Sequence, residues 1–177
     1  MTQTPEIIDL LIESRWIAAV DPDIVLKNHA VAVNHGRIVA VLPTNDARSR
    51  YKASQKSTLD EHILIPGLVN LHTHAAMSLM RGIADDLPLM TWLQKHIWPT
   101  EAEHLSPQFV YDGTRLACAE MLKGGITCFN DMYFFPQAAA EAATQVGMRA
   151  ALGITLLEFP NPYASDAEDY LNKGLAV

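Results

Sequence analysis

The chain has 177 residues, 49% of them hydrophobic, so it is long and apolar enough to bury a core and is predicted to be globular and not disordered. Its 13 basic and 20 acidic residues give a formal charge of −7, which excludes the basic surface that nucleic-acid backbones require. No apolar run reaches the length of a membrane span, and the polar, acidic N-terminus does not resemble a signal peptide. We therefore expect a cytoplasmic protein that binds neither nucleic acid nor a membrane.

The first third of the chain has the pattern of a β-sheet. Between Ile7 and Ile65, short apolar stretches with a period of two are separated by turn residues, which predicts antiparallel strands. Residues 30–33 and 38–41 are two such stretches, and they flank the sequence Asn-His-Gly-Arg at residues 34–37. A short glycine-containing turn between two apolar stretches predicts a β-hairpin.

The pattern changes at Ile63, where the run ILIPGLVNLH is almost continuously apolar. Such a run indicates a strand that is buried on both faces in a parallel sheet. Ser106 and Pro107 then have the pattern of an N-cap and a first helical residue. The helix that they begin should end near Lys123, before the pair of glycines at residues 124–125.

Two more strands and a second helix are predicted beyond this point. The second strand should extend from Ile126 to Met132. Pro136 should begin an alanine-rich helix that ends at Gly147, and residues 149–156 have the length and apolar character of a third strand. The predicted order after Ile63 is therefore β-α-β-α-β.

This order predicts an α/β protein in which a small β domain precedes either an open sheet or a (β/α) barrel. The boundary is expected near residues 60–63, which gives a β domain at residues 1–62 and the βα units at residues 63–177. From Leu64 onward the chain has 114 residues, from 64 to 177, whereas a complete eight-stranded barrel typically needs about 250. The chain would therefore contain roughly the first half of such a barrel.

His72 and His74 are the strongest candidate functional residues. They stand two positions apart at the C-terminal end of the first buried strand, where strand geometry directs both imidazoles to one side. Catalytic sites of barrels lie at this end of the strands, and imidazole is the commonest metal ligand in proteins. The alternative is that two polar residues simply enter a loop. However, a connection of about thirty residues follows, and loops of that length are uncommon unless they have a function. The context therefore favours a metal site.

Other chemically distinctive residues have weaker support from the sequence. Trp92 and Trp98 lie in the long connection and would suit either the wall of an apolar pocket or the packing of a loop helix. Asp131 stands at the end of the second strand and is expected to orient a neighbour without binding metal. Cys118 and Cys128 match neither a disulfide framework nor a zinc knuckle, so buried free thiols are expected.

The stretch LIPGLVNLHTHAAMSLMRG resembles the first barrel strand and metal motif of the amidohydrolase superfamily. The following stretch, RGIADDLPLMTWLQKHIWPTEAEHLS, resembles the loop of the deaminases that act on 5-methylthioadenosine and S-adenosylhomocysteine, which belong to the same group as the triazine hydrolases. The likeness continues through MLKGGITCFNDMYFFP and GMRAALG. It covers essentially the whole chain.

This resemblance implies a β-sandwich domain beside a (β/α)8 TIM barrel that holds one divalent metal ion, with zinc as the expected metal. His72 and His74 would be metal ligands, and Glu101 would bind the ribose hydroxyls of a nucleoside. Without the resemblance, Glu101 would be read as an acidic residue at the start of a helix, where it interacts favourably with the dipole. A carboxylate has two acceptor oxygens, which suits the paired hydroxyls of a ribose.

The implied reaction is hydrolytic deamination of 5-methylthioadenosine or S-adenosylhomocysteine, in which metal-bound hydroxide attacks C6 of adenine and releases ammonia and an inosine-type product. Catalytic zinc commonly has three protein ligands, so two histidines are an incomplete set. The acid/base residues and the remaining ligands are expected beyond Val177. We therefore expect residues 1–177 alone to bind metal weakly and to be inactive. The resemblance also allows for a homo-oligomer.

Two features keep alternatives open. Relatives that handle S-adenosylhomocysteine carry an arginine near the position of Ile154, and the apolar residue here favours methylthioadenosine or adenosine-like substrates. The shared fold and the H-x-H motif also suit other amidohydrolase reactions, such as guanine deamination or triazine dechlorination. An inactive half-barrel that serves as a binding fragment is the alternative of a different class.

Overall fold

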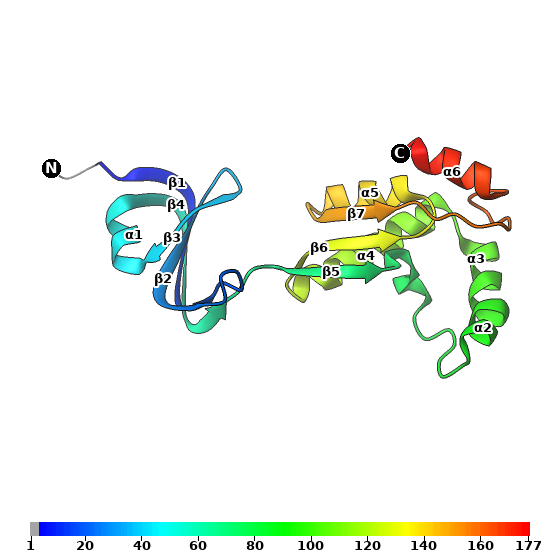
Figure 1. The fold of residues 1–177 in the computed structure, drawn as a ribbon, viewed down its shortest axis with the longest axis horizontal. Helices are drawn as coiled ribbons and strands as arrows, with labels where there is room; N and C mark the ends of the chain where they lie inside the picture. The colour runs from blue at the N-terminus through cyan, green and yellow to red at the C-terminus, as the bar shows by residue number, and fades with distance from the viewer. Residues whose placement is uncertain (1–3) are drawn as a thin grey trace. The chain divides into compact units, whose positions relative to one another are not determined.

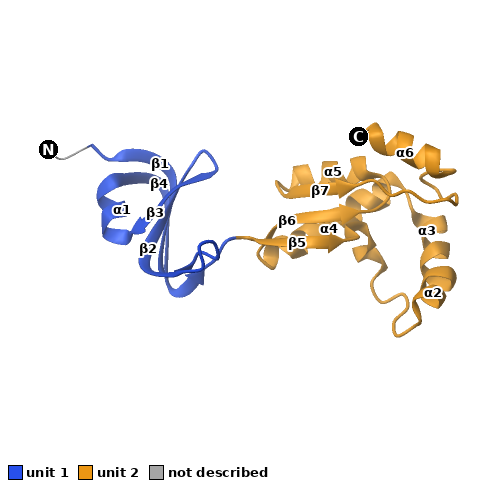
Figure 2. Cartoon of the chain, viewed as in Figure 1, with its two compact units in different colours: residues 1–66 blue, residues 67–177 orange. Residues whose placement is uncertain are grey.

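A computed structural model describes residues 4–177 of the chain. The chain divides into two compact units, residues 1–66 and residues 67–177, which are coloured blue and orange in Figure 2. Each unit has its own sheet (Figure 1). The division falls between Pro66 and Gly67.

Unit 1 consists of one four-stranded sheet and one helix. Its elements are β1 (Glu6–Ala18), β2 (Val25–Asn34), β3 (Arg37–Pro43), α1 (Thr44–Arg50) and β4 (Tyr51–Leu64). The strands lie in the order β3-β2-β1-β4. Among residues 4–66 there is a single sheet, so the second layer that a β-sandwich requires is not confirmed.

The hairpin predicted within residues 30–41 is confirmed. Strands β2 and β3 are antiparallel, and Asn34 pairs with Arg37 across the turn. The two turn residues, His35 and Gly36, have φ angles of 49° and 70°. Positive φ at both central positions defines a type I′ turn, whose twist matches that of the flanking strands.

The prediction of a wholly antiparallel sheet is wrong for the last strand. β1 pairs with β2 in antiparallel fashion, but it pairs with β4 in parallel fashion. Parallel neighbours need a crossover connection. Helix α1 supplies it, because it carries the chain back so that β4 runs in the same direction as β1. The helix packs on the sheet through Ala47, which is fully buried against Ile8 and Ala32.

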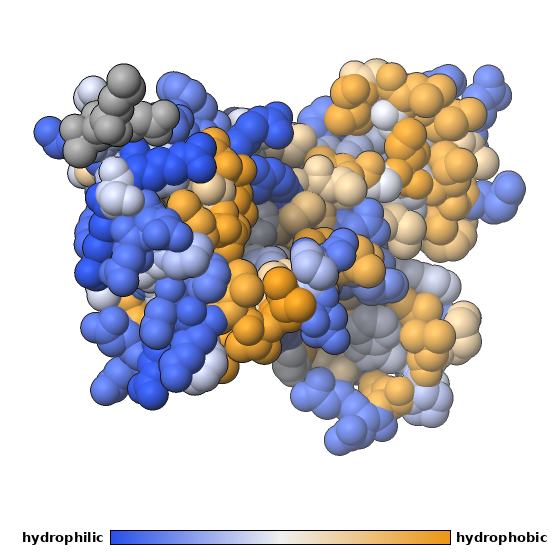
Figure 3. Space-filling model, turned by 60° about the vertical axis from the view of Figure 1, so that its left-hand side comes forward, coloured by the Kyte–Doolittle hydropathy of each residue, from blue (hydrophilic) through white to orange (hydrophobic). Residues whose placement is uncertain are grey.

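The opposite side of this sheet leaves apolar side chains exposed. Alternate residues of a strand point to opposite faces, and Ile7 is 74% exposed where its neighbour Ile8 is 1% exposed. Ile38 in β3 is 67% exposed. Figure 3 colours the surface by hydropathy, and orange areas mark exposed hydrophobic residues.

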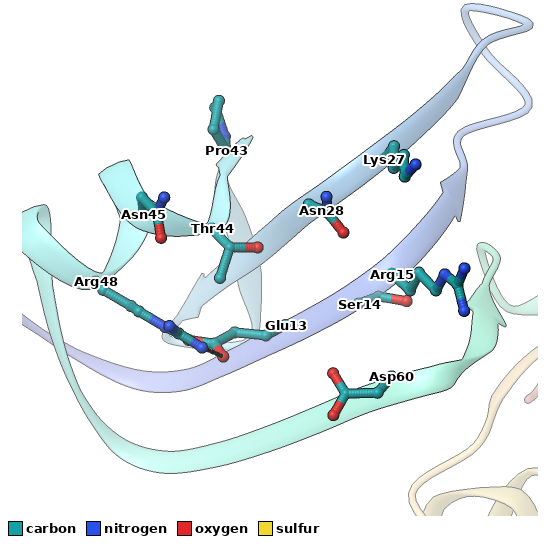
Figure 4. Close-up of a pocket in the computed structure, with 10 residues that line it drawn as sticks. All are labelled: Glu13, Ser14, Arg15, Lys27, Asn28, Pro43, Thr44, Asn45, Arg48 and Asp60. Atoms are coloured by element: carbon teal, nitrogen blue, oxygen red, sulfur yellow. Dashed lines mark hydrogen bonds and ion pairs between the residues drawn. The ribbon is translucent and has the colours of Figure 1, made fainter.

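An ion cluster around a buried glutamate lies at the edge of a polar hollow of about 610 Å³ in unit 1 (Figure 4). Glu13 in β1 is only 3% exposed. Its two oxygens accept hydrogen bonds from Arg48 at 2.8 and 2.7 Å, and the Lys56 ammonium lies 2.7 Å from Oε1. Both oxygens of this carboxylate are therefore occupied by cations of the same unit.

Unit 2 contains a three-stranded parallel sheet in the order β5-β6-β7 and several helices. Its elements are β5 (Leu68–Thr73), the 3-10 helix η1 (Ala75–Met80), α2 (Leu89–Trp92), the π-helical turn η2 (Leu93–Ile97), α3 (Trp98–His104), α4 (Pro107–Lys123), β6 (Ile126–Met132), α5 (Pro136–Gln145), β7 (Arg149–Gly153) and α6 (Ala167–Leu175). The order of predicted strands and helices is thus confirmed, and the helices of the long connection and α6 are additions to it.

The helices of the βα units begin and end where the sequence predicts. The Ser106 hydroxyl accepts a hydrogen bond from the Phe109 amide at 3.2 Å and so caps α4. Helix α5 begins at Pro136 and is followed by Gly147, whose φ of 72° suits a helix C-terminus. None of the helices in residues 4–177 is long and apolar enough to span a membrane.

Two strand boundaries differ from the prediction. The apolar run from Ile63 to His72 is not one strand, because β4 ends at Leu64 and β5 begins at Leu68. Pro66 cannot donate a ladder hydrogen bond. Gly67 is required by close packing, since a Cβ there would lie 2.4 Å from the Thr127 hydroxyl oxygen. The third strand ends at Gly153, three residues before the predicted end.

Helices α4 and α5 cover only one face of the parallel sheet. Phe129 in β6 is fully buried beneath Cys118 of α4 and Ala143 of α5. Cys118 and Cys128 are both free thiols, as predicted, although Cys128 is only half-buried. On the other face, the described residues leave Leu71 75% exposed. Parallel sheets are normally covered on both faces.

The ion cluster of unit 1 leads to a pH-dependent stability prediction. The hydrogen bond from Arg48 lowers the pKa of Glu13 from 4.5 to about 2. Burial opposes this shift, and Lys56 adds to it. Since this folded-state pKa lies below the ordinary value, ionised Glu13 stabilises unit 1 fully above about pH 4.5, and the contribution is lost as the pH falls towards 2. Glu13→Gln should lower the free energy of unfolding by about 1–2 kcal/mol at pH 7, because Arg48 and Lys56 are half-exposed and stay hydrated.

Urea denaturation between pH 2 and 7 would measure this effect. All proteins would carry Trp92→Phe and Trp98→Phe, so that the fluorescence of Trp16 reports unit 1 alone. Glu61→Gln, at an exposed position of β4, is the matched control and should have little effect. A difference between Glu13→Gln and the parent that stays constant down to pH 2 would contradict the prediction.

Candidate active site

His72 and His74 lie together at the C-terminal end of the parallel sheet. His72 belongs to β5, and His74 follows the strand at the start of η1. Their ring centroids are 5.2 Å apart and the ring planes meet at 81°. His72 is exposed and His74 is half-buried. The two imidazoles are thus close enough for their nitrogens to serve one ion.

The orientation of His74 is fixed by the neighbouring strand. Its Nδ1 lies 2.7 Å from the carbonyl oxygen of Met132, the last residue of β6. A carbonyl only accepts, so Nδ1 carries the proton, and in the neutral imidazole Nε2 then has the free lone pair. Metal-binding histidines are usually held in this way by a second acceptor. The donor chemistry of His74 therefore fits a metal ligand.

Asp131, the residue before Met132, holds the chain on both sides of His74. It is 2% exposed. Its Oδ1 accepts hydrogen bonds from the Thr73 hydroxyl and from the Ala75 amide, each at 2.8 Å. Burial raises the pKa of the Asp131 carboxyl, while these two hydrogen bonds oppose the shift. Asp131 thus orients the turn that carries His74, in the role that its place at the strand end suggested.

The side chain of Asn130 adds a further link between the same two strands. Its Nδ2 donates to the carbonyl oxygen of Leu71 at 3.1 Å. The Thr73 hydroxyl also lies 2.9 Å from the carbonyl oxygen of Asn130. Three consecutive residues at the end of β6 therefore hold the end of β5 and the turn that follows it.

Glu101 faces inward from the first turn of α3. It is 8% exposed, and its Oε1 accepts a hydrogen bond from the Tyr133 hydroxyl at 2.7 Å. Burial is the main cause that raises the pKa of Glu101, and the hydrogen bond from Tyr133 and the charge of His74 act against it. Burial likewise raises the pKa of Tyr133 far above its ordinary range. Glu101 is therefore not only an acidic residue at a helix start, because it is buried and also accepts a hydrogen bond from a tyrosine.

A cavity of about 190 Å³ brings these residues together. Its wall contains His74, Glu101 and Tyr133, and it also contains Trp92 and Trp98 from the long connection. Trp98 packs against Phe159, with ring centroids 5.3 Å apart. The structure thus gives the two tryptophans the pocket position that the sequence left open, whereas His72 does not belong to the wall.

Ile154 lies outside this wall. Its side chain packs against Gly174 of α6, where an added Cβ would lie 2.2 Å from the Ile154 Cγ2. The neighbours Thr155 and Leu157 line the cavity instead. The residue that the family resemblance singled out for substrate choice is therefore not part of the wall of this cavity.

The described residues contain no complete group of metal ligands. Among residues 4–177, no group of three or more His, Cys, Asp or Glu side chains converges so as to hold an ion. Catalytic zinc commonly takes three protein ligands. By themselves, His72 and His74 would therefore be fewer ligands than such a zinc ion takes.

The sequence missed Tyr133 as a site residue. It follows the end of β6 directly, at the same edge of the sheet as His74. In open α/β sheets and in barrels, functional residues gather beyond the carboxyl ends of the strands. The rule that identified the histidines at the end of β5 applies equally to the residue that follows β6.

Known proteins resemble this chain over most of its length. A deaminase of Saccharophagus degradans named for 5-methylthioadenosine and S-adenosylhomocysteine is 51% identical over 170 residues, which are 96% of this chain and 38% of that protein. A 5′-deoxyadenosine deaminase of Methanococcoides burtonii is 43% identical over 151 residues, which are 85% of this chain and 34% of that protein.

A solved structure agrees with the fold. The adenosine deaminase of Xanthomonas campestris, crystallised with bound zinc, matches 98% of this chain and 40% of its own with a TM-score of 0.95 and 50% identity. This chain therefore spans about two fifths of the length of the proteins it matches. The family model described as "Amidohydrolase family" matches residues 63–175. That match includes β5 with its two histidines and covers more than half of the 177 residues, so the chain belongs to the amidohydrolase family.

Proposed function

We propose that this chain forms the N-terminal part of a metal-dependent hydrolytic deaminase. The substrate would be an adenosine-type nucleoside, 5-methylthioadenosine or S-adenosylhomocysteine, and the products an inosine-type nucleoside and ammonia. The observation that carries the proposal is the cavity in which a half-buried imidazole and a buried carboxylate share an aromatic wall. The names of the relatives in Saccharophagus and Methanococcoides agree with it.

The parallel sheet of unit 2 would be the first part of a (β/α)8 barrel. Its strands β5 and β7 are edge strands, and the face with Leu71 lacks a cover among the described residues. Further strands would pair with these edges and bury that face. In the same way, the sheet of unit 1, with Ile7 and Ile38 exposed, would be one layer of a β-sandwich. The proposed domains are residues 1–62 and 63–177.

His72 and His74 would hold the divalent metal, with zinc as the expected ion. Such an ion activates a water molecule at about neutral pH. The Met132 carbonyl keeps the His74 proton on Nδ1 and leaves Nε2 for the ion. The remaining ligands and the acid/base groups would come from polypeptide beyond Val177, which the relatives' greater length allows for.

Glu101 would bind the ribose. Its carboxylate only accepts hydrogen bonds, and a ribose offers two neighbouring hydroxyl donors. Trp92 and Trp98 would cover the base and exclude water, as aromatic side chains commonly do in ligand sites. Guanine and the triazines have no ribose, so a buried carboxylate in this wall supports a nucleoside over those alternatives.

The charge of the wall favours methylthioadenosine over S-adenosylhomocysteine. The described residues that line the cavity include neither lysine nor arginine. The amino-acid carboxylate of S-adenosylhomocysteine would therefore find no cationic partner among them. Comparison of kcat/KM for the two nucleosides tests this choice, and a clear preference for S-adenosylhomocysteine would reverse it.

Loss of both imidazoles should abolish metal binding and ammonia release. The double variant His72→Ala, His74→Ala would be compared with the parent in the longest natural polypeptide that carries this chain. Zinc content after dialysis and ammonia release from methylthioadenosine are the two measurements. His62→Ala, at an exposed position of unit 1, is the matched control and should change neither. Unchanged zinc content in the double variant would refute the assignment of the ligands.

Residues 1–177 alone should bind zinc weakly and release no ammonia, because two imidazoles are an incomplete ligand set. The same two assays on the isolated chain check this expectation. Robust deamination by the 177-residue chain would contradict it.

Asp131 should control metal affinity without binding the metal. Asp131→Ala removes the acceptor of two hydrogen bonds beside His74 and should weaken zinc binding by roughly 10- to 100-fold. Asp131→Asn keeps an oxygen at the Oδ1 position and should retain most of the affinity. Competition with a chromogenic chelator measures both variants. Equal losses in the two variants would mean that the negative charge, and not the hydrogen bonds, is responsible.

A further inference from the structure

The hydrogen bond between Tyr133 and Glu101 joins two elements that are far apart in the sequence. Tyr133 directly follows β6, and Glu101 lies in α3, 32 residues earlier. The distance of 2.7 Å from the hydroxyl to Oε1 is that of a well-formed hydrogen bond to a carboxylate oxygen. Both side chains are buried, at 7% and 8% exposure. Loss of this bond would therefore leave a buried oxygen with one donor fewer.

The two oxygens of Glu101 differ in their surroundings. Oε1 accepts from Tyr133, whereas Oε2 receives no hydrogen bond within residues 4–177. Oε2 is nevertheless not completely sealed inside the protein, and Glu101 lines the cavity. Glu13 in unit 1 shows the contrast, because cations of its own unit occupy both of its oxygens. Glu101 thus keeps acceptor capacity that faces the cavity.

Tyr133 is itself firmly held, so its hydroxyl is a fixed donor. Its ring packs against Phe134, with centroids 5.0 Å apart, and lies 6.4 Å from the ring of His74. The Thr155 hydroxyl donates to its carbonyl oxygen at 3.3 Å. A glutamate side chain has several rotatable bonds, and ordering it when a ligand binds costs free energy. A fixed donor on Oε1 removes much of that cost in advance.

We propose that Tyr133 is a positioning residue that orients the Glu101 carboxylate for the hydroxyls of the nucleoside ribose. The inference rests on the proposed function and adds a residue to it. Tyr133 itself would not touch the reacting atoms. Its effect would be confined to substrates that carry the hydroxyl that Glu101 binds.

The test is Tyr133→Phe in the longest natural polypeptide that carries this chain. Ammonia release would be measured with methylthioadenosine and with its 2′-deoxy and 3′-deoxy analogues. For the ribonucleoside, kcat/KM should fall about tenfold, mainly through KM, as expected when a charge-assisted hydrogen bond is weakened. For at least one deoxy analogue the change should be much smaller, so the preference for the ribonucleoside shrinks.

The decisive quantity is the ratio of kcat/KM for methylthioadenosine to kcat/KM for a deoxy analogue, measured with the same variant. A fall in the amount of folded enzyme lowers all three rates equally and cancels in the ratio. Glu101→Gln should reduce the same preference, and the double variant should add little to it, because the two residues would act as one unit. Independent, additive losses would overturn the proposal.

Tyr163→Phe is the matched control. Tyr163 is buried in the same aromatic cluster, and its hydroxyl has no hydrogen-bond partner among the described residues. Removal of this hydroxyl should leave the substrate preference unchanged. A change as large as that of Tyr133→Phe would show that any tyrosine of the cluster suffices and would overturn the proposal.

The outcomes separate this inference from the proposed function. If the parent enzyme deaminates methylthioadenosine and Tyr133→Phe reduces all three substrates by the same factor, the positioning role is wrong and the proposed function stands. If the parent releases no ammonia from any of the three nucleosides, the proposed function fails and the positioning role fails with it.

Discussion

The candidate site depends on the way in which the end of β6 holds the turn after β5. Asp131 accepts from residues on both sides of His74, and the carbonyl of Met132 accepts from the His74 ring. These bonds connect residues 56 or 58 positions apart, so they form only when the two strands lie side by side. A buried aspartate is costly unless its hydrogen bonds are made. The register of the sheet and the orientation of the imidazole are therefore stabilised together.

The same edge of the sheet organises the cavity. Residue 132 of β6 holds His74, and residue 133 holds Glu101. Two adjacent residues, Met132 and Tyr133, thus position the imidazole of His74 and the carboxylate of Glu101. The hydrogen bond from Tyr133 explains how a connection of about thirty residues can place a side chain at a defined position. Helix α3 of this connection is hydrogen-bonded to the residue after β6 through Glu101 itself.

The three buried carboxylates of the described residues, Glu13, Asp131 and Glu101, differ in their surroundings. Both oxygens of Glu13 are bonded to Arg48 or Lys56, whereas Asp131 accepts from Thr73 and Ala75 through Oδ1 alone. Glu101 alone among them has an oxygen that receives no hydrogen bond within the described residues while it lines a cavity. Burial without saturation costs stability, and such groups are concentrated at functional sites.

Local patterns in the sequence determined the elements of unit 2 and the pair of histidines. The Ser106 cap, the proline at residue 136 and the apolar strands act over a few residues, so they can be read without a partner. The tertiary structure decided what depends on distant contacts. The parallel pairing of β4 with β1 follows from the crossover of α1, and the break at Pro66 depends on the close approach of Gly67 to Thr127. Likewise, only packing brings Tyr133 to Glu101 and takes Ile154 away from the cavity, because strand pairing and side-chain burial join residues whose spacing in the sequence carries no signal.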